Sequence, residues 1–509
     1  MEKVCIILAI IIYLAVLLYL GFKYSKKNLS VSDYYLGGRK LGPYVTAMSA
    51  EASDMSSWLL LGLPGVAYAS GICDAFWTAL GLGIGTYLNW LLCAKRLRHY
   101  TEITGSVTVP DFFENRFRDK SHILMAVSAI VIVIFFIPYT GSGFAACGKL
   151  FSSLFGIDYF VAMIISAVII VTYTAAGGFL AASTTDFIQS VVMSVALICV
   201  VCFGVSCCGS TAVIYDYSHS LDGFMSISSM FSDTGAVPYG PITVLSTMAW
   251  GLGYFGMPHI LLRFMAIEDP KKIKLSRRIG TVWVFIAMSV AIAIGVIARC
   301  MSHVGALGEA DNFLADPETA VIEIANLLST HGVLAAFLAG VIMAGILACT
   351  MSTCDSQLLA ASSSISENIL VSVLGIKIDE KKKMIIARVT LVIISIIGMI
   401  IARDPASSVF KIVSFAWAGF GGAFGPVMLL ALFWKRTNTP GAIAGMVSGG
   451  VMIFVWKFLV RPMGGALDIY ELLPAFIVSL LFTVAVSLAT KEPDKEIQKE
   501  FDKVFELSK

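Results

Sequence analysis

The sequence predicts an all-α polytopic membrane protein that forms a single transmembrane domain over residues 1–509. The first observation is composition: 58% of the residues are hydrophobic and 14% are charged, whereas about 25% are charged in a typical soluble domain. The second is that apolar runs of about 18 to 25 residues recur along the whole chain, each long enough to cross a bilayer as a helix. The third is that no polar connection is long enough to hold a soluble domain.

About thirteen apolar runs are predicted to be transmembrane helices. In chain order they lie near 3–21, 44–69, 74–94, 122–148, 158–176, 181–207, 239–262, 279–303, 320–349, 384–402, 406–434, 440–460 and 470–490. The first run is expected to be a retained helix rather than a signal peptide, because no small-residue cleavage site follows it.

The basic residues predict the orientation, because Lys and Arg are enriched in cytoplasmic connections. They cluster after the first span, after the third, after the seventh (beginning at Arg263) and before the tenth. Residues 204–262, by contrast, contain neither Lys nor Arg. With an odd number of spans, this pattern places the N-terminus outside and the tail 491–509 in the cytoplasm. We therefore expect a multi-pass protein of the cell membrane.

Several function classes are disfavoured by what the sequence contains. The net charge of +2 gives no reason to expect a nucleic-acid partner, and topology explains the basic clusters. The chain has no GxxxxGK[ST] nucleotide-binding sequence and no HExxH or GxSxG motif, and its eleven cysteines lack zinc or haem spacing. We therefore expect no enzyme, no resident cofactor and no obligate protein partner. The remaining classes are a channel, a sensor without an output domain, and a secondary transporter in the lipid bilayer.

The second span contains the sequence ASDMSSW at residues 52–58, which places one carboxylate and three hydroxyls inside an apolar segment. A charge is costly at membrane depth, so Asp54 is predicted to be functional. The sequence GLPG at 62–65 is typical of a broken helix, whose freed carbonyls are tolerated only where they line a cavity. A cation is the natural ligand of freed carbonyls, hydroxyls and one acid. The alternative is a kink at which Asp54 caps a helix end.

The seventh span is also interrupted, by three glycines and a proline between Trp250 and His259. Such a segment cannot form a regular helix unaided. In many secondary transporters, two broken helices occupy corresponding positions of two inverted repeats, and the substrate binds where the breaks meet. Here the breaks lie five spans apart, which predicts a five-plus-five inverted repeat over about 43–208 and 237–436.

The ninth span continues into the sequence MSTCDS at 351–356, in which every side chain carries oxygen or sulfur. Ser352 and Ser356 share a helix face because they are four residues apart, and Asp355 is also a neighbour of Ser352. Hard oxygens of this kind suit Na⁺ by analogy with other hard cations. The alternative is that the hydroxyls bond back to their own helix, as is common in membranes.

These segments resemble the sodium:solute symporter family, and within it the sodium/proline symporters of bacteria. The resemblance is carried, in chain order, by 33–39 (DYYLGGR), 52–56 (ASDMS), 62–65 (GLPG), 109–117 (VPDFFENRF), 177–178 (GG), 185–186 (TD), Gln189, 250–260 (WGLGYFGMPHI), 351–357 (MSTCDSQ), 417–420 (WAGF) and 433–436 (FWKR). It implies a LeuT-type core of ten helices, with one helix before the core and two after it.

The resemblance also implies a main sodium site between the broken second span and the ninth span. Carried over, its ligands are the carbonyls of Ala52, Met55 and Cys349 and the hydroxyls of Ser352 and Thr353. Asp54 and Ser56 are expected to couple sodium to transport, because sodium/proline symporters need the matching aspartate for sodium-dependent function.

Some family members hold a second sodium ion. The resemblance assigns such a site here to Asp186, Ser352, Asp355 and Ser356. The alternative for Asp186 is a gating or structural carboxylate.

The resemblance maps a proline pocket onto aromatic residues of the two breaks and the fourth span, together with neighbouring positions. These residues are Trp58, Tyr139, Trp250, Tyr254 and Pro258, with Ser57 and Met257 beside them. Aromatic faces suit a pyrrolidine ring and its ammonium group, while helix ends and freed amides suit the carboxylate.

Three departures from the family pattern bear on the substrate. Ser57 replaces a usual glycine, Met257 stands where glutamine is common, and Glu51 is an additional acid. The prediction is therefore a symporter that couples inward Na⁺ flow to uptake of L-proline by alternating access. The alternatives are another small solute (a different amino acid, a monocarboxylate or a sugar), or a non-transporting sensor or channel.

Overall fold

The computed structural model describes residues 2–25, 31–405 and 408–508, and this part of the chain is largely helical. The helices, in chain order, are α1 (Glu2–Ser25), α2 (Val31–Leu36), α3 (Pro43–Ser57), α4 (Leu63–Ser70), α5 (Ile72–Asn89), α6 (Lys95–Thr104), α7 (Val109–Phe117), α8 (Ile123–Phe155), α9 (Tyr159–Cys207), α10 (Thr211–Ser220), α11 (Pro241–Met248), α12 (Pro258–Ala266), α13 (Ile273–His303), α14 (Ala320–Ser329), α15 (Val333–Ser363), α16 (Glu380–Ile401), α17 (Val409–Phe433), α18 (Thr439–Val455), α19 (Leu472–Ala489) and α20 (Lys495–Leu507). Two short strands, β1 (Ser229–Met230) and β2 (Val237–Pro238), pair antiparallel between α10 and α11. The prediction of an all-α protein is confirmed.

Within the described ranges, nine helices are long and apolar enough to cross a membrane: α1, α8, α9, α13 and α15 to α19. Other predicted spans fall on segments that the structure divides or joins. The two spans predicted near 158–176 and 181–207 both fall within α9, whose helical backbone is interrupted between them at Gly178 (φ 67°, ψ −173°). The predicted total of about thirteen spans stays a prediction.

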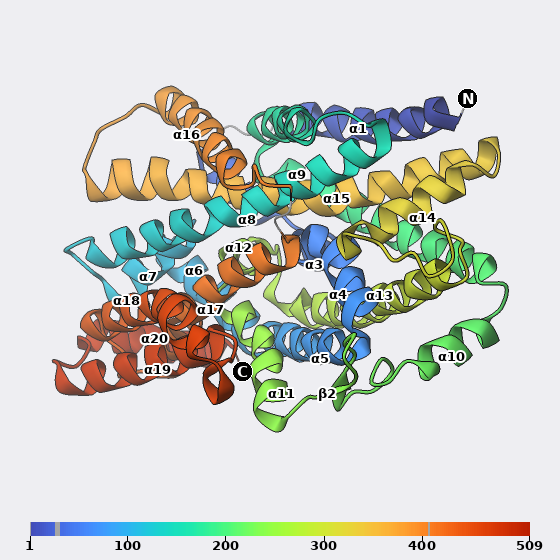
Figure 1. Cartoon of the computed structure of the whole chain (residues 1–509). Helices are drawn as coiled ribbons and strands as arrows, with labels where there is room; N and C mark the ends of the chain where they lie inside the picture. Colours follow the sequence, from blue (N-terminus) through green and yellow to red (C-terminus); the bar gives the residue numbers. More distant parts are fainter. Residues whose placement is uncertain (1, 26–30, 406–407, 509) are drawn as a thin grey trace.

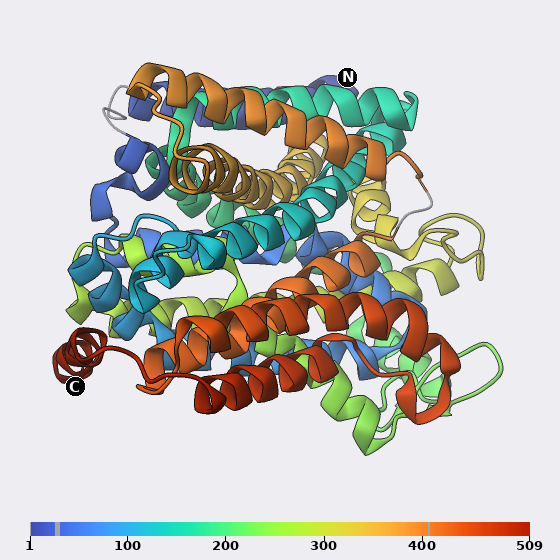
Figure 2. The same ribbon diagram turned by 90° about the vertical axis from the view of Figure 1, so that its left-hand side faces the viewer.

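The two broken segments lie in the middle of the molecule. In Figure 1, α1, α15 and α16 lie in the upper part, α3 and α4 in the centre, and α5 and α11 in the lower part. Figure 2 shows that the C-terminal helices stay on the side opposite α16 after a quarter turn. Helix α15 packs against α9, α1, α8 and α3, so the centre of the structure is enclosed by helices from both halves of the chain.

The first break lies at Ser56, which has φ 48° and ψ −172° and separates the body of α3 from its last residue. The sequence had pointed to Gly62–Gly65, about two turns later, and that position was wrong. Gly62 and Leu63 have helical dihedral angles, and Pro64 stands in the first turn of α4. The helix runs into α4 from the π-helical segment η2 (Trp58–Gly62), after which the Leu63 N–H bonds to the Trp58 carbonyl, so Pro64 does not break the helix.

The second break lies where the sequence predicted it. Residues 249–256 form a tight 3-10 segment, η4 (Ala249–Gly256), and Met257 is extended before α12 begins at Pro258. The glycines permit close packing: a Cβ on Gly251 would lie 2.2 Å from the carbonyl oxygen of Gly81 on α5. Small residues of this kind let membrane helices approach each other closely. The break is therefore held against α5.

Candidate functional site

The predicted sodium ligands gather where α3 meets α15. The hydroxyl of Ser352 donates to the carbonyl of Ala52 at 2.8 Å and to that of Cys349 at 3.1 Å. The hydroxyl of Thr353 donates to the same Cys349 carbonyl at 3.1 Å. Met55, the fifth predicted ligand, lies next to the break in α3 and is buried. These bonds link four of the five predicted ligands in one chain: Ala52, Ser352, Cys349 and Thr353.

Asp54 lies beside this cluster and is buried, with 7% of the residue exposed. Its carboxylate accepts a hydrogen bond from the Tyr254 hydroxyl on η4, and the Tyr139 hydroxyl on α8 donates to its carbonyl at 3.5 Å. No Lys or Arg of the described residues forms an ion pair with Asp54. A buried carboxylate is costly unless a cation or strong hydrogen bonds compensate its charge. The site therefore contains a buried acid whose charged form a mobile cation can stabilise.

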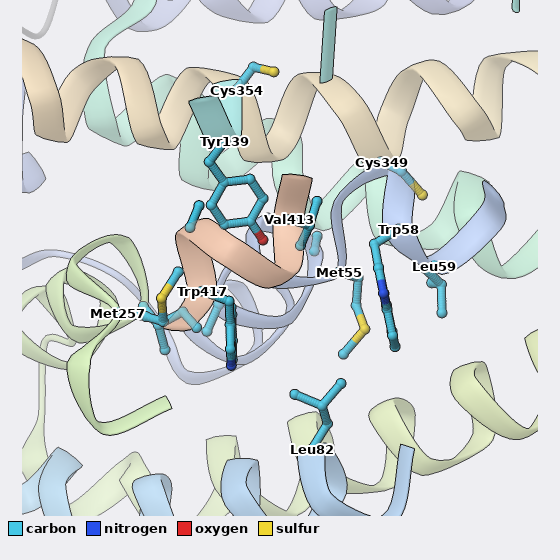
Figure 3. Packing of buried hydrophobic residues seen from close by; sticks show 14 of the residues in the cluster. Met55, Trp58, Leu59, Leu82, Tyr139, Met257, Cys349, Cys354, Val413 and Trp417 are labelled. Atoms are coloured by element: carbon cyan, nitrogen blue, oxygen red, sulfur yellow. The ribbon is translucent and has the colours of Figure 1, made fainter. Parts of the chain in front are cut away.

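Aromatic side chains from both breaks form a compact cluster around Asp54. The rings of Trp58 and Trp250 lie 5.9 Å apart, and the Trp417 indole donates to the Trp250 carbonyl at 2.7 Å. A cavity of about 10 Å³ lies among Asp54, Met55, Trp58, Leu82, Tyr139, Trp250, Val413 and Trp417. Figure 3 shows Met55, Trp58, Leu82, Tyr139, Val413 and Trp417 around this space. A cavity of this size is at the lower limit for one water molecule, so binding of a larger solute requires the cluster to open.

One donor of this cluster has no partner. The indole nitrogen of Trp58 is buried and makes no hydrogen bond to any residue that the structure describes. Buried donors are nearly always satisfied, so an exception at a cavity points to a ligand or water that completes it. Trp58 thus combines an apolar ring face with a free N–H.

A second acidic centre lies between α9, α12 and α15. Arg263, which the sequence analysis grouped with a basic connection, is fully buried there. Its guanidinium contacts Asp186 at 3.1 Å and Ser356 at 2.5 Å, and its Nε donates to Ser49 at 3.0 Å. Ser49 in turn donates to Asp186 at 2.6 Å. Asp186 therefore already has a cationic partner, unlike Asp54.

Comparison with known proteins identifies the family. The model of the sodium:solute symporter family matches residues 34–449. The chain belongs to the sodium:solute symporter family. Two curated relatives match it over nearly their full lengths. The sodium/proline symporter of Staphylococcus aureus is 38% identical over 98% of this chain and 95% of its own length. The osmoregulated proline transporter OpuE of Bacillus subtilis is 39% identical over 99% of both.

Solved structures show the fold. A Na⁺-coupled sialic acid symporter in a substrate-bound outward-open state aligns with a TM-score of 0.78 at 18% identity, covering 96% of this chain and 99% of its own. MhsT in complex with L-phenylalanine aligns with a TM-score of 0.51 at 13% identity, covering 88% and 98%. The predicted LeuT-type architecture is confirmed by these neighbours.

The substrate residues predicted from the family resemblance fall into two groups. Trp58, Tyr139 and Trp250 line the small cavity. The lining does not include Ser57, Tyr254, Met257 or Pro258. Ser57 is buried next to the break with its hydroxyl unpartnered, and Tyr254 is bonded to Asp54. Met257 and Pro258 are buried at the start of α12.

The second-sodium residues of the family resemblance also lie close together. One carboxylate oxygen of Asp355 accepts a hydrogen bond from the Ser356 hydroxyl at 3.0 Å. The other oxygen is buried and has no hydrogen-bond partner among the described residues. Ser356 also receives the Arg263 bond described above. The assignment of a second ion to this centre stays a prediction.

Sequence reasoning did not assign three of the residues that line the cavity: Leu82, Val413 and Trp417. Leu82 and Val413 are ordinary apolar residues within spans and carry no signal of their own. Trp417 lies in a segment that carried the family resemblance, and Gly253 on η4 packs against its indole ring. A Cβ on Gly253 would lie 1.9 Å from the Trp417 indole nitrogen. The glycine in the break and the tryptophan on α17 therefore fit each other.

Proposed function

We propose that this protein is a Na⁺-coupled symporter that takes up L-proline by alternating access. The observation that carries the proposal is Asp54, a buried carboxylate without a basic partner between a cluster of carbonyl and hydroxyl oxygens and an aromatic cavity. A bound cation stabilises the charged form of this buried acid, and in this way solute binding can depend on cation binding. The names of the two curated relatives support proline as the solute.

The sodium ion is assigned to the carbonyls of Ala52, Met55 and Cys349 and to the hydroxyls of Ser352 and Thr353. These oxygens are neutral, so they provide coordination while Asp54 provides charge. Because the hydroxyls of Ser352 and Thr353 donate to carbonyls of the same cluster, Na⁺ binding requires them to rotate and present lone pairs. Ser56 supports this arrangement, since its hydroxyl accepts from the Trp58 backbone N–H at 3.1 Å.

The substrate is assigned to the aromatic cavity. The faces of Trp58, Trp250 and Tyr139 suit the apolar side of a pyrrolidine and favour its ammonium group. The unpartnered Trp58 N–H is a donor for the carboxylate. A neutral sugar has neither an ammonium group for the aromatic faces nor a carboxylate for the Trp58 N–H. The departures at Ser57, Met257 and Glu51 keep another small amino acid as the second candidate.

In the proposed orientation the N-terminus lies outside and α20 lies in the cytoplasm, within a cell membrane. The distribution of basic residues supports this orientation. We further propose that the chain performs no enzymatic reaction and needs neither a resident cofactor nor a protein partner, with Na⁺ as its coupling ion.

The test is uptake of radiolabelled L-proline into proteoliposomes with and without an inward Na⁺ gradient. L-Proline should bind between tenfold and a hundredfold more tightly than glycine. It buries about three more methylenes, each of which contributes about 0.8 kcal/mol. Proline methyl ester and D-glucose should compete poorly, since one lacks the carboxylate and the other lacks both charges. If a sugar or a monocarboxylate is taken up with Na⁺ and excess L-proline does not inhibit this uptake, the assignment of L-proline as the substrate is wrong. If none of these solutes is taken up in a Na⁺-dependent manner, the proposal of a Na⁺-coupled symporter is wrong.

A further inference from the structure

A groove of about 1200 Å³ lies at the end of the molecule where α18 begins and α19 ends. It is formed by the turn between α7 and α8, by α18, by the end of α19 and by the start of α20, helices that Figure 1 shows together. Its volume exceeds the roughly 300–1,000 Å³ of most small-molecule sites. The residues of α18 that line it recur at helical spacing and so share one face of the helix: Pro440, Ile443, Ala444, Val447, Ser448 and Val451.

Most of the groove is apolar, and this part faces away from the protein interior. Val447, Val451 and Phe482 are 45%, 55% and 51% exposed, and both α18 and α19 are long and apolar enough to cross a membrane. In a bilayer these side chains therefore contact acyl chains. The lining of α18 extends from Thr439 to Val451, which is about 18 Å at a rise of about 1.5 Å per residue. One leaflet is about half of a hydrocarbon core of about 30 Å, so the groove is about as long as one leaflet is deep.

The remaining part of the groove is charged and lies at the ends of the helices. Its charged residues are Arg118, Asp119, Lys120, Lys491, Glu492 and Asp494. In the proposed orientation this end of the molecule is cytoplasmic. The aliphatic part of the groove thus lies within the bilayer and the charged part at its surface, which is the arrangement that an amphipathic lipid requires.

Every acid of the groove is already engaged. The Asp119 carboxylate accepts from a backbone N–H in the first turn of α8 at 2.9 Å. Glu492 contacts the Arg436 guanidinium at 3.6 Å, and Asp494 contacts the Lys491 ammonium at 3.7 Å. The groove therefore offers no unengaged carboxylate to a cationic group.

One cation of the groove, by contrast, is unpaired. Lys120 is exposed and makes no hydrogen bond or ion pair with any residue that the structure describes. Arg118, close to it in the chain, is paired with Glu496 and Glu500 of α20. The first backbone N–H groups of α20 are also uncapped, because the side chain of its N-cap residue Asp494 accepts no bond from them. An unpaired ammonium beside a helix N-terminus favours an anion over a cation.

We propose that this groove binds one anionic phospholipid of the surrounding membrane, with its phosphate at Lys120 and an acyl chain along α18 between Ile443 and Val451. Lys120 supplies the complementary charge, and the apolar face of α18 has the length of one leaflet. A zwitterionic lipid also carries an ammonium group, for which the groove holds no unengaged acid. The bound lipid joins the turn between α7 and α8 to α18 and α20. The leaflet, on the cytoplasmic side, follows from the proposed orientation, whereas the binding itself does not depend on which solute is transported.

The experiment is native mass spectrometry of the full chain in detergent, with phosphatidylglycerol and phosphatidylcholine offered at equal concentrations. We expect the parent to retain a single phosphatidylglycerol in preference to phosphatidylcholine. Lys120→Gln should bind phosphatidylglycerol about fivefold more weakly, which corresponds to the roughly 1 kcal/mol that one basic residue contributes near an anionic surface. Lys120→Arg keeps the charge and should bind the lipid as the parent does.

Lys274→Gln is the matched control for the charge. Lys274 is an exposed lysine in the first turn of α13 and does not line the groove. Like Lys120, it makes no ion pair with any of the described residues. Its replacement changes the net charge by the same amount and should leave lipid retention unchanged.

Val447→Trp tests the apolar part of the groove. The indole occupies the space of the acyl chain, so retention of phosphatidylglycerol should fall at least as far as in Lys120→Gln. Val389→Trp is the control, because Val389 is a 52% exposed valine on α16, on the side opposite the C-terminal helices. If Val447→Trp cannot be purified, Val451→Trp places the same side chain one turn further along the groove.

Several results would overturn the proposal. One is equal retention of the two lipids by the parent, and another is a Lys120→Gln or Val447→Trp variant that matches its control. Displacement of the lipid by millimolar inorganic phosphate would assign the groove to a free anion instead. A dimer of the parent that Val447→Trp converts to a monomer would assign it to a second copy of the chain. None of these results depends on L-proline uptake, so the proposed function is tested separately.

Discussion

Replacement of Ser352 by Ala gives the sharpest test of the sodium site. The hydroxyl of Ser352 is one of five assigned ligands, and it also bonds α15 to the Ala52 carbonyl of α3 at 2.8 Å. The variant removes one oxygen and leaves a methyl-sized side chain in a buried position. The backbone of α15 is unchanged, because alanine is a strong helix former.

The expected magnitude follows from the loss of one contact to a charged ligand. Hydrogen bonds to charged groups contribute about 1.5–3 kcal/mol, and each 1.4 kcal/mol is about tenfold in affinity. We therefore expect the Na⁺ concentration for half-maximal uptake to rise by about tenfold to a hundredfold. Thr353→Ala should produce a similar rise, although Thr353 bonds within α15 and not to α3. This second variant distinguishes a lost ligand from a lost link between helices.

The assay is proline uptake into proteoliposomes over a range of Na⁺ concentrations at constant ionic strength. Ser363→Ala is the control, since Ser363 is a buried serine of the same helix that bonds to its own Ala360 carbonyl at 2.8 Å. It should leave the Na⁺ dependence unchanged. If both Ser352→Ala and Thr353→Ala behave like this control, the site assignment is wrong. A shift in Ser352→Ala alone would show that the residue links the two helices instead of binding the ion.

Two further predictions use the same uptake assay. Asp54→Asn keeps the size of the side chain and removes its charge, so we expect it and Asp54→Ala to lose most Na⁺-driven uptake; parent-like uptake by Asp54→Asn across all Na⁺ concentrations would make Asp54 a structural cap. Gly253→Ala places a Cβ 1.9 Å from the Trp417 indole nitrogen, so uptake should fall at least tenfold, roughly the effect of 1.4 kcal/mol. Gly450→Ala, whose Cβ would lie 3.9 Å from its nearest neighbour, should transport normally, and equal activity of the two variants would contradict the packing argument.

The two breaks show what sequence patterns can and cannot locate. The second was placed correctly because three glycines in η4 lie where helices must approach closely. The first was placed too late because Pro64 looks like a helix breaker, yet the chain is helical on both sides of it, in η2 and in α4. The actual break is at Ser56, a residue type that seldom has a positive φ. Tertiary packing around Asp54, and not local propensity, sets this position.

The C-terminal tail and the start of α17 show a similar limit. Residues 491–509 were expected to be a mixed-charge cytoplasmic segment, whereas α20 is a helix that buries Ile497, Phe501 and Val504. Its apolar residues at helical spacing were a signal that charge counting overlooked. By contrast, Glu318 accepts a bond from the backbone N–H of Phe410, in the first turn of α17, at 3.0 Å, although the two residues are 92 apart in segments without a motif. Only the three-dimensional structure brings such a pair together.

Asp54 and Asp186 illustrate why residue type alone does not define a cation site. Both are acids within apolar spans. Asp54 was expected to couple sodium to transport, and the family resemblance placed Asp186 in a second sodium site, with a gating or structural role as the alternative. The structure gives Asp186 a counter-ion, the Arg263 guanidinium at 3.1 Å, and gives Asp54 a tyrosine hydroxyl. A sodium ion at Asp186 must therefore displace or share a tethered cation, whereas one near Asp54 compensates a charge that nothing else pairs. Substitution of Asp54 should therefore change the cation dependence of transport more than substitution of Asp186 does. A second ion should bind only in a state in which Arg263 has moved away from Asp186.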